Sequence, residues 1–304
     1  MKISRLSSLL AAAGLFVTVG AAQATVTFSF NPNGTGAVGA IAGATTLDQA
    51  VGSTLALNAT NFGRPLAVGT QITDYYQANL AIVQDENGDI LFSNGGSGKF
   101  FTFVATFTEY VTSSVIDGAG VKTTFGITGG TFKMCAQTAS GNNLAGTGFA
   151  CAGNGILSGT IKGGNATQTS FPSSLQPLDR FGADNWGGTQ TVTSAGAASL
   201  LAQLDFVDAG YFPDLNVNTQ LTLASVNSSL ISPYDQVNPS RQFSSNTIAN
   251  GDVAANVGAI NGVTGPNFIF QSDANSSFAI PEPGSLAIVG VALAGLALVR
   301  RRKA

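Results

Sequence analysis

The sequence predicts an all-β protein whose body, residues 25–280, is an antiparallel β-sandwich or has a jelly-roll-like fold. Three observations support this prediction. Apolar and polar residues alternate with the period of two that is typical of strands, and turn dipeptides containing glycine follow one another at short intervals. Charged residues make up only 10% of the chain, which contains 38 glycines. Many short strands joined by glycine-rich turns favour a sandwich over a helical or α/β fold.

The N-terminal segment has the features of an export signal. Lys2 and Arg5 precede an apolar stretch over residues 6–19, and Ala22-Gln23-Ala24 follows it. A basic start, an apolar helix and a small-x-small site are the pattern that signal peptidase recognises. We therefore expect a signal helix over residues 1–24 and an exported protein that begins at Thr25.

The first strands of the body are predicted by their alternation. Residues 25–30 alternate without interruption, which predicts one strand with Val26, Phe28 and Phe30 on the same face. A longer strand starts near residue 101, and its apolar face would contain Phe101, Phe103, Ala105 and Phe107. Threonines occupy the opposite face, so this strand is predicted to bury its aromatic side.

Two dipeptides predict hairpins. Asn87-Gly88 separates the apolar runs 80–84 and 90–92, and Asp117-Gly118 separates residues 110–116 from 121–127. Further strands are expected at residues 155–161, 190–193, 219–226 and 267–271. Residues 163–177 are rich in Ser, Thr, Gly and Pro and are expected to form a long loop, whereas residues 195–204 are the single helix candidate of the body.

The two cysteines, Cys135 and Cys151, are predicted to form a disulfide because an exported chain meets an oxidising compartment. The closed loop of about 16 residues would stabilise the fold by roughly 3 kcal/mol. A metal pair is the alternative, but it lacks further cysteines and any histidine. The sequence therefore favours a disulfide.

The body has a more negative net charge than the value of −3 for the whole chain. Six of the 13 basic residues and one of the 16 acidic residues lie in the two terminal segments, so the body has 7 basic against 15 acidic residues and a formal charge of −8. Nucleic-acid binding needs clustered Lys and Arg and is not expected. A surface of neutral hydroxyl and amide groups suits hydrated polysaccharide, although exported β-proteins commonly have this composition.

No catalytic centre is evident. The chain has no histidine, which excludes Ser-His-Asp and Cys-His catalysis and the usual zinc sites. Most acids lie at predicted turns. Glu109 has the parity of the buried face of its strand, but a solvated strand end is the favoured interpretation. The alternative is an acid at the edge of the core with a raised pKa. Asp85, Asn87 and Asp89 have calcium-loop spacing without the EF-hand glycine and glutamate. We expect no catalytic residues, metal or cofactor.

The C-terminal segment, residues 281–304, combines three features. Pro281, Glu282 and Pro283 precede an apolar run over residues 286–299, which is followed by the basic stop of Arg300, Arg301, Arg302 and Lys303. A helix here would be about 24 Å long, just short of the roughly 30 Å hydrocarbon core. The basic stop would keep its end in the cytoplasm. The segment is thus expected to be a transmembrane helix, and an ordinary membrane anchor is one interpretation.

This segment resembles the PEP-CTERM sorting signal of Gram-negative bacteria. The resemblance implies processing by an exosortase-type membrane protease, transient anchoring in the inner membrane, and a final location in the periplasm, on the outer surface or in the extracellular matrix.

Segments of the body resemble flocculation-associated PEP-CTERM proteins. They are residues 75–80, 146–149, 156–159, 211–215 and 268–275. The resemblance implies a non-enzymatic protein that supports flocculation and biofilm formation by association with exopolysaccharide. One alternative is a lectin-like carbohydrate-binding module, in which Tyr75, Tyr76 and Trp186 would stack on sugar rings unless they pack in the core. A less favoured alternative is a polysaccharide-acting enzyme, which needs two converging carboxylates.

Overall fold

The fold is built from strands alone within the residues that the computed structural model describes, namely 24–57, 64–143, 145–151, 153, 155–177, 190–217, 219–227, 259–263 and 268–280. The strands are β1 (Ala24–Thr25), β2 (Phe28–Phe30), β3 (Ile41–Ala44), β4 (Thr46–Gln49), β5 (Gly52–Leu57), β6 (Gln71–Gln84), β7 (Ile90–Ser93), β8 (Phe100–Asp117), β9 (Gly120–Gln137), β10 (Gly155–Pro177), β11 (Gln190–Val207), β12 (Gln220–Asn227) and β13 (Phe268–Ile280). The predicted all-β class with a sandwich-like antiparallel arrangement is confirmed.

The predicted signal helix over residues 1–24 and the predicted transmembrane helix over residues 281–304 lie outside the described residues, except for Ala24. In the described part of the chain, no helix has the length and hydropathy needed to cross a membrane.

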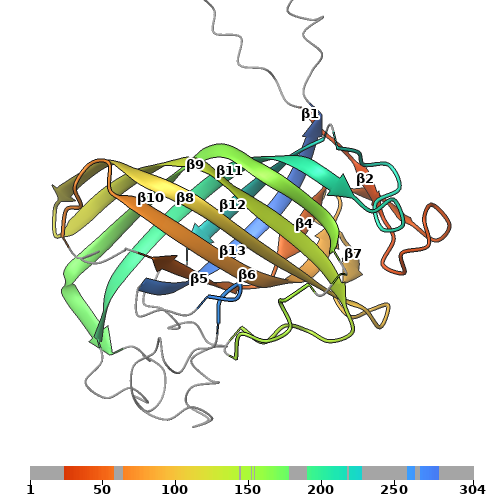
Figure 1. The fold of residues 1–304 in the computed structure, drawn as a ribbon, viewed down its shortest axis with the longest axis horizontal. Helices are drawn as coiled ribbons and strands as arrows, with labels where there is room; N and C mark the ends of the chain where they lie inside the picture. Colours follow the sequence, from red (N-terminus) through yellow and green to blue (C-terminus); the bar gives the residue numbers. More distant parts are fainter. Residues whose placement is uncertain are drawn as a thin grey trace, which may run out of the picture. The chain divides into compact units, whose positions relative to one another are not determined.

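One antiparallel sheet contains nearly all of the strands. Its neighbours follow the order β13-β12-β11-β10-β9-β8-β6, and these strands lie side by side in Figure 1. The sheet then closes, because β4 and β5 both pair with β6 on one side and with β13 on the other. Strands β2 and β3 form a separate pair. The closed hydrogen-bonding circuit gives the sheet an inner face and an outer face.

Both predicted hairpins are confirmed. Gly88 and Gly118 have φ values of 83° and 60°, which favour glycine over residues with a side chain. The first turn joins β6 to β7, and the second joins β8 to β9 with Asp117 opposite Gly120. The turn chemistry therefore sets the register of the longest strand pair.

Three expectations need correction. Residues 163–177 belong to β10 instead of a loop, and residues 195–204 belong to β11 instead of a helix. The helix propensity of residues 195–204 is overridden because β10 and β12 pair with this segment on either side. In the strand, every second side chain faces the core, namely those of Ala198, Leu200, Ala202 and Leu204. The single strand expected over residues 25–30 is divided into β1 and β2, although Phe28 and Phe30 are buried as predicted.

Bulges change which residues of the long strands face inward. In β9 the pairing passes from Ile127 opposite Glu109 to Gly129 opposite Thr108, and exposed Thr128 is left between them. Phe125 and Ile127 therefore face inward on one side of the bulge, and Phe132 faces inward on the other. A change of parity of this kind cannot be read from simple alternation.

The inner face contains two apolar clusters. The larger one includes Tyr76 and Phe107, and the smaller one includes Ile72 and Val111. Asp74 lies between Ile72 and Tyr76 along β6, and Glu109 lies between Phe107 and Val111 along β8. The two clusters are thus separated by buried carboxyl groups.

Candidate functional site

A groove on the described surface has polar side chains from neighbouring strands on its floor. Thr106 of β8 pairs with Thr131 of β9, while Lys133 of β9 pairs with Ser158 of β10. Residues directly opposite each other in a sheet present their side chains on the same face. These four residues line a groove with a volume of about 670 Å³. The floor is thus mixed, because these hydroxyl and ammonium groups lie beside the side chain of Val104, which pairs with Lys133.

Two chain segments form the walls of this groove. Residues 146–151, in the connection between β9 and β10, supply Phe149 and Cys151, and the other segment supplies Asn261 and Gly262. The Asn261 side chain donates hydrogen bonds to the Ala105 carbonyl oxygen and the Thr106 hydroxyl, at 3.2 and 2.8 Å. These bonds attach the second wall directly to β8.

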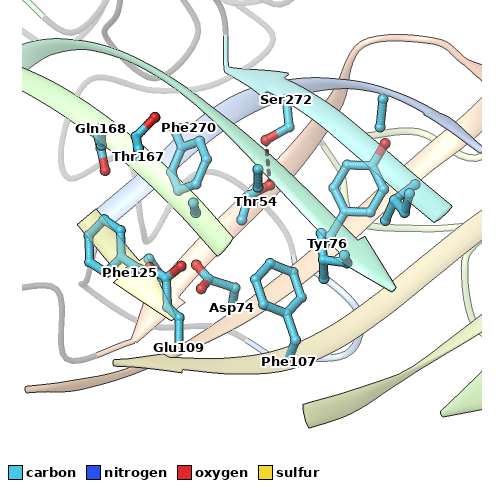
Figure 2. A pocket seen from close by; sticks show the side chains of 16 residues that line it. Thr54, Asp74, Tyr76, Phe107, Glu109, Phe125, Thr167, Gln168, Phe270 and Ser272 are labelled. Carbon is cyan, nitrogen blue, oxygen red and sulfur yellow. Dashed lines mark hydrogen bonds between the residues drawn. The ribbon is translucent and has the colours of Figure 1, made fainter. Parts of the chain in front are cut away.

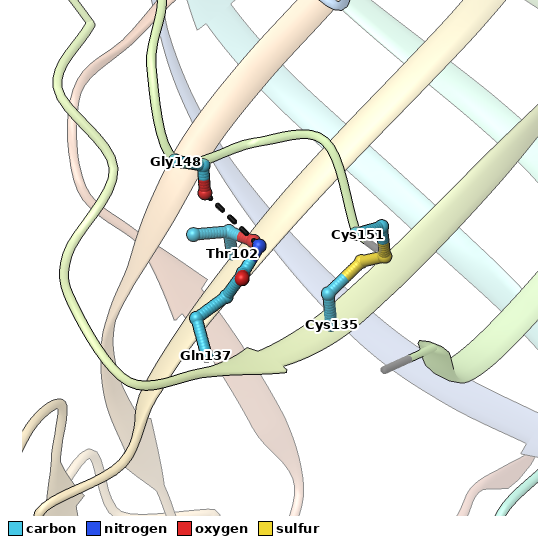
Figure 3. Close-up of a disulfide and its surroundings, with 5 residues drawn as sticks. All are labelled: Thr102, Cys135, Gln137, Gly148 and Cys151. Atoms are coloured by element: carbon cyan, nitrogen blue, oxygen red, sulfur yellow. Dashed lines mark hydrogen bonds between the residues drawn. A yellow bond between two sulfur atoms is a disulfide. The ribbon is translucent and has the colours of Figure 1, made fainter. Parts of the chain in front are cut away.

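The predicted disulfide between Cys135 and Cys151 is present, with 5.5 Å between the Cα atoms (Figure 3). It ties the first wall to β9. Gln137 donates hydrogen bonds to the Gly148 carbonyl oxygen at 3.0 Å and the Thr102 hydroxyl at 3.4 Å. The wall is therefore held by a covalent link and by hydrogen bonds, which gives the groove a defined shape.

An exposed aromatic ring lies beside the groove floor. Phe206 of β11 pairs directly with Ser158, and its side chain is 48% exposed. Next to it, Asp205 lines the groove and accepts a hydrogen bond from Thr160 at 2.6 Å. Phe206 was not predicted as a site residue, because the bulge between Ser158 and Gly159 displaces this part of β11 from simple alternation.

The three aromatic residues predicted to bind glycan are not brought together on one surface. Tyr75 is half-buried and pairs with Thr106 of the groove floor. Tyr76 is 4% exposed and belongs to the main core, so its ring is not available to stack on a sugar at the surface. Trp186 lies outside the described residues.

A pair of carboxyl groups occupies the inner face of the sheet. Asp74 is 3% exposed and Glu109 is 7% exposed. They are diagonal neighbours, because Glu109 pairs with Ile72 and Asp74 pairs with Phe107. Figure 2 shows the two carboxyl groups pointing toward each other. The favoured expectation of a solvated strand end at Glu109 is therefore wrong, because this position is buried where β8 pairs with β6. Its partner Asp74 was not predicted.

Burial dominates the electrostatics of this pair. Burial raises the pKa of Glu109 to about 8. Burial and the adjacent Glu109 carboxylate raise the pKa of Asp74 well above its usual range. A carboxyl group in a low-dielectric environment favours its neutral form, and a second acid nearby adds to this effect. The pair therefore retains protons at pH values where exposed carboxyl groups are ionised.

The residues with calcium-loop spacing form a turn. The Asp85 carboxylate accepts hydrogen bonds from the backbone amides of Asn87 and Asp89, both at 2.9 Å. The bond from Asp89 is the main reason why the pKa of Asp85 is lowered. No group of three or more metal-ligating side chains occurs among the described residues. The Asp85 carboxylate thus stabilises the hairpin between β6 and β7.

Comparison with known protein families gives one match, at the end of the chain. Residues 279–303 match the family model described as the PEP-CTERM protein-sorting motif. The chain carries a PEP-CTERM sorting motif. This match includes Pro281, Glu282, Pro283 and the basic stop at residues 300–303, all of which lie outside the described residues. The PEP-CTERM motif implies an exported protein that passes through the membrane and is processed by exosortase, a membrane protease. No curated protein and no solved structure matches the chain.

Proposed function

We propose that this PEP-CTERM protein is a non-enzymatic component of the cell surface or extracellular matrix of a Gram-negative bacterium. It supports flocculation and biofilm formation by associating with exopolysaccharide. Signal peptidase removes residues 1–24, and exosortase processes the C-terminal tail after transient anchoring in the inner membrane. The polar groove beside Phe206 is the observation that carries the proposal.

The groove has the chemistry that a hydrated glycan requires. Its floor offers the hydroxyls of Thr106, Thr131 and Ser158, and Lys133 and Asp205 add one charge of each sign. Sugar hydroxyls both donate and accept hydrogen bonds, so such a mixed lining can pair with them. The apolar face of a sugar ring can pack against the exposed ring of Phe206.

A binding experiment tests the proposal. Exopolysaccharide from flocs of the host strain is titrated against the wild-type protein and Phe206→Ala. Loss of one aromatic contact should weaken binding by about tenfold. Tyr110→Ala is the matched control, because Tyr110 is also an exposed aromatic residue of the sheet but pairs with Gln71 and Gly126, neither of which lines the groove. Equal binding by wild type and Phe206→Ala would contradict the assignment of the groove.

Three further measurements separate the proposed role from its alternatives. Deletion of the gene should reduce floc formation, and unchanged aggregation would refute the role in flocculation. Saturable binding to one defined glycan would favour the lectin-like alternative over general matrix association. Release of reducing sugar ends from the polysaccharide would contradict the non-enzymatic role.

Mass spectrometry of the mature protein tests the processing steps. We expect an N-terminus at Thr25 and a C-terminus near residues 281–284. An intact Ala304 would show a retained anchor instead of cleavage.

A further inference from the structure

The buried carboxyl pair lines a cavity on the inner face of the sheet. This cavity has a volume of about 40 Å³, and its lining comes from several strands that are distant in sequence (Figure 2). Asp74 and Tyr76 come from β6, Glu109 from β8, and Thr54 and Ser272 from β5 and β13. Roughly 10–15 Å³ of such space accommodates one water molecule. The cavity therefore has room for about three to four non-hydrogen atoms.

Oxygen atoms in this cavity lack partners. The Oδ2 atom of Asp74 and the hydroxyl of Tyr76 are buried and form no hydrogen bond with the part of the chain that the structure describes. The Thr54 and Ser272 hydroxyls bond to each other at 2.8 Å. Orphaned buried polar atoms are rare in folded proteins, because each costs the free energy of its lost hydration. The unpaired Oδ2 atom of Asp74, whose carboxyl group points toward Glu109 in Figure 2, indicates a missing polar partner in the cavity.

The lining specifies the chemistry of this partner. Among the described lining residues there is no lysine or arginine, so the described part of the lining supplies no cation to the carboxyl pair. The rings of Phe107, Phe125 and Phe270 line the same cavity. A ligand with a small donor-rich cationic end can neutralise the carboxylates, and a short apolar stem can pack against the rings.

We propose that the cavity binds a short primary alkylammonium group. Its N–H groups donate to the carboxylates of Asp74 and Glu109, and its two or three carbon atoms contact the aromatic rings. Small side chains provide the space for the stem, namely those of Ala56, Ala166, Ala198 and Ala274. This binding site is independent of the proposed glycan groove, which has a different lining.

A divalent metal fits these residues less well. Calcium takes six to eight oxygen ligands, whereas the acidic side chains among the described lining residues are only Asp74 and Glu109 and much of this lining is apolar. An ammonium ion needs only about three acceptors. The residues of the cavity therefore favour the organic cation.

Binding should strengthen as the pH rises from 6 to 8.5. The titratable groups of the lining are Asp74, Glu109 and Tyr76. Burial raises the pKa of Glu109 to about 8, so this carboxylate becomes available only near the upper end of the range. The pKa of Tyr76 is also raised by burial, with smaller effects of Asp273 and Asp48, and its hydroxyl stays neutral. A primary alkylammonium keeps its charge throughout, as its pKa resembles the value of about 10.4 for lysine.

The test uses n-propylammonium as the probe and the full exported protein at pH 8.5, with binding followed by calorimetry and by the shift in melting temperature. We expect saturable binding that is at least tenfold weaker in Asp74→Asn and at least tenfold weaker at pH 6. Asp117→Asn is the matched control, because this exposed hairpin acid should leave binding unchanged. Glu109→Gln provides a second variant if Asp74→Asn does not fold.

Neutral and metal probes make the result decisive. The same measurements with n-propanol, which has the same length but no charge, should give no saturable binding. Binding of n-propanol as tight as that of n-propylammonium would overturn the proposal, as would an unchanged affinity in both carboxyl variants or no binding to wild type. Tighter binding of calcium through Asp74 would identify a metal site instead.

Discussion

Replacement of Glu109 by glutamine should make the protein markedly less sensitive to alkaline pH. Burial raises the pKa of Glu109 from its usual 4.5 to about 8. The folded state therefore binds a proton that the unfolded state has already released, and stability falls as the pH rises between these two values. The contribution of Glu109 is fully present below about pH 4.5 and is lost as the pH passes through about 8.

The magnitude follows from the two pKa values. One pKa unit corresponds to about 1.4 kcal/mol, so the Glu109 carboxyl should destabilise the fold by about 4 kcal/mol between pH 5 and pH 8.5. An amide cannot ionise, and Glu109→Gln avoids this loss. Removal of the charge at residue 109 also relieves the repulsion that raises the pKa of Asp74.

Urea unfolding followed by circular dichroism at pH 5, 7 and 8.5 measures the effect. The difference in unfolding free energy between Glu109→Gln and wild type should increase with pH in favour of the variant. Asp117→Asn removes an exposed carboxylate from the hairpin between β8 and β9 and should run parallel to wild type. Parallel curves for Glu109→Gln and wild type would refute the reasoning.

Two further predictions concern covalent and steric restraints. Cys135→Ser should lower the unfolding free energy by about 3 kcal/mol, since it opens a loop closed over a separation of 16 residues; equal melting temperatures for the variant and the oxidised wild type would contradict this. Gly130→Ala would place its Cβ atom 2.1 Å from the Thr106 carbonyl oxygen, whereas at Gly129 the nearest atom lies 3.5 Å away. We expect Gly130→Ala to lower the free energy of unfolding by about 1–3 kcal/mol or more and Gly129→Ala to be tolerated. Chemical denaturation measures both variants. Similar losses of unfolding free energy at the two positions would exclude the steric explanation.

Local patterns in the sequence predicted those parts of the fold that depend on neighbouring residues. Tight turns are favoured by the dipeptides at residues 87–88 and 117–118 themselves. The alternating aromatic residues of β8 likewise define its buried face without help from distant residues. Residues 163–177 and 195–204 do not specify their strands in this way. The loop-like composition of the first segment and the helix-favouring alanines and leucines of the second are overridden by pairing with neighbouring strands. Composition therefore misled the prediction where pairing decides the structure.

The carboxyl pair shows why the site could not be predicted fully. Parity placed Glu109 on the buried face, but Asp74 is distant from it in sequence. The two meet because β8 pairs with β6 beyond the short segment that pairs with β7. Phe206 was missed for a related reason, since its position beside the groove depends on a bulge between β10 and β11. Alternation of apolar and polar residues along one segment predicts neither the order of the strands in the sheet nor the positions of the bulges.

The closure of the sheet by its last strand has a consequence for export. β13 bonds to β12 along one edge and to β4 and β5 along the other, and it ends at Ile280, directly before the Pro-Glu-Pro triplet. Its partners β4 and β5 lie more than 200 residues earlier in the chain, so this closure requires contacts between segments that are far apart in sequence. The sorting motif implies export, so a body that crosses the membrane unfolded completes its sheet only after β13 has crossed. Translocation of β13 and final folding of the body are then coupled in time.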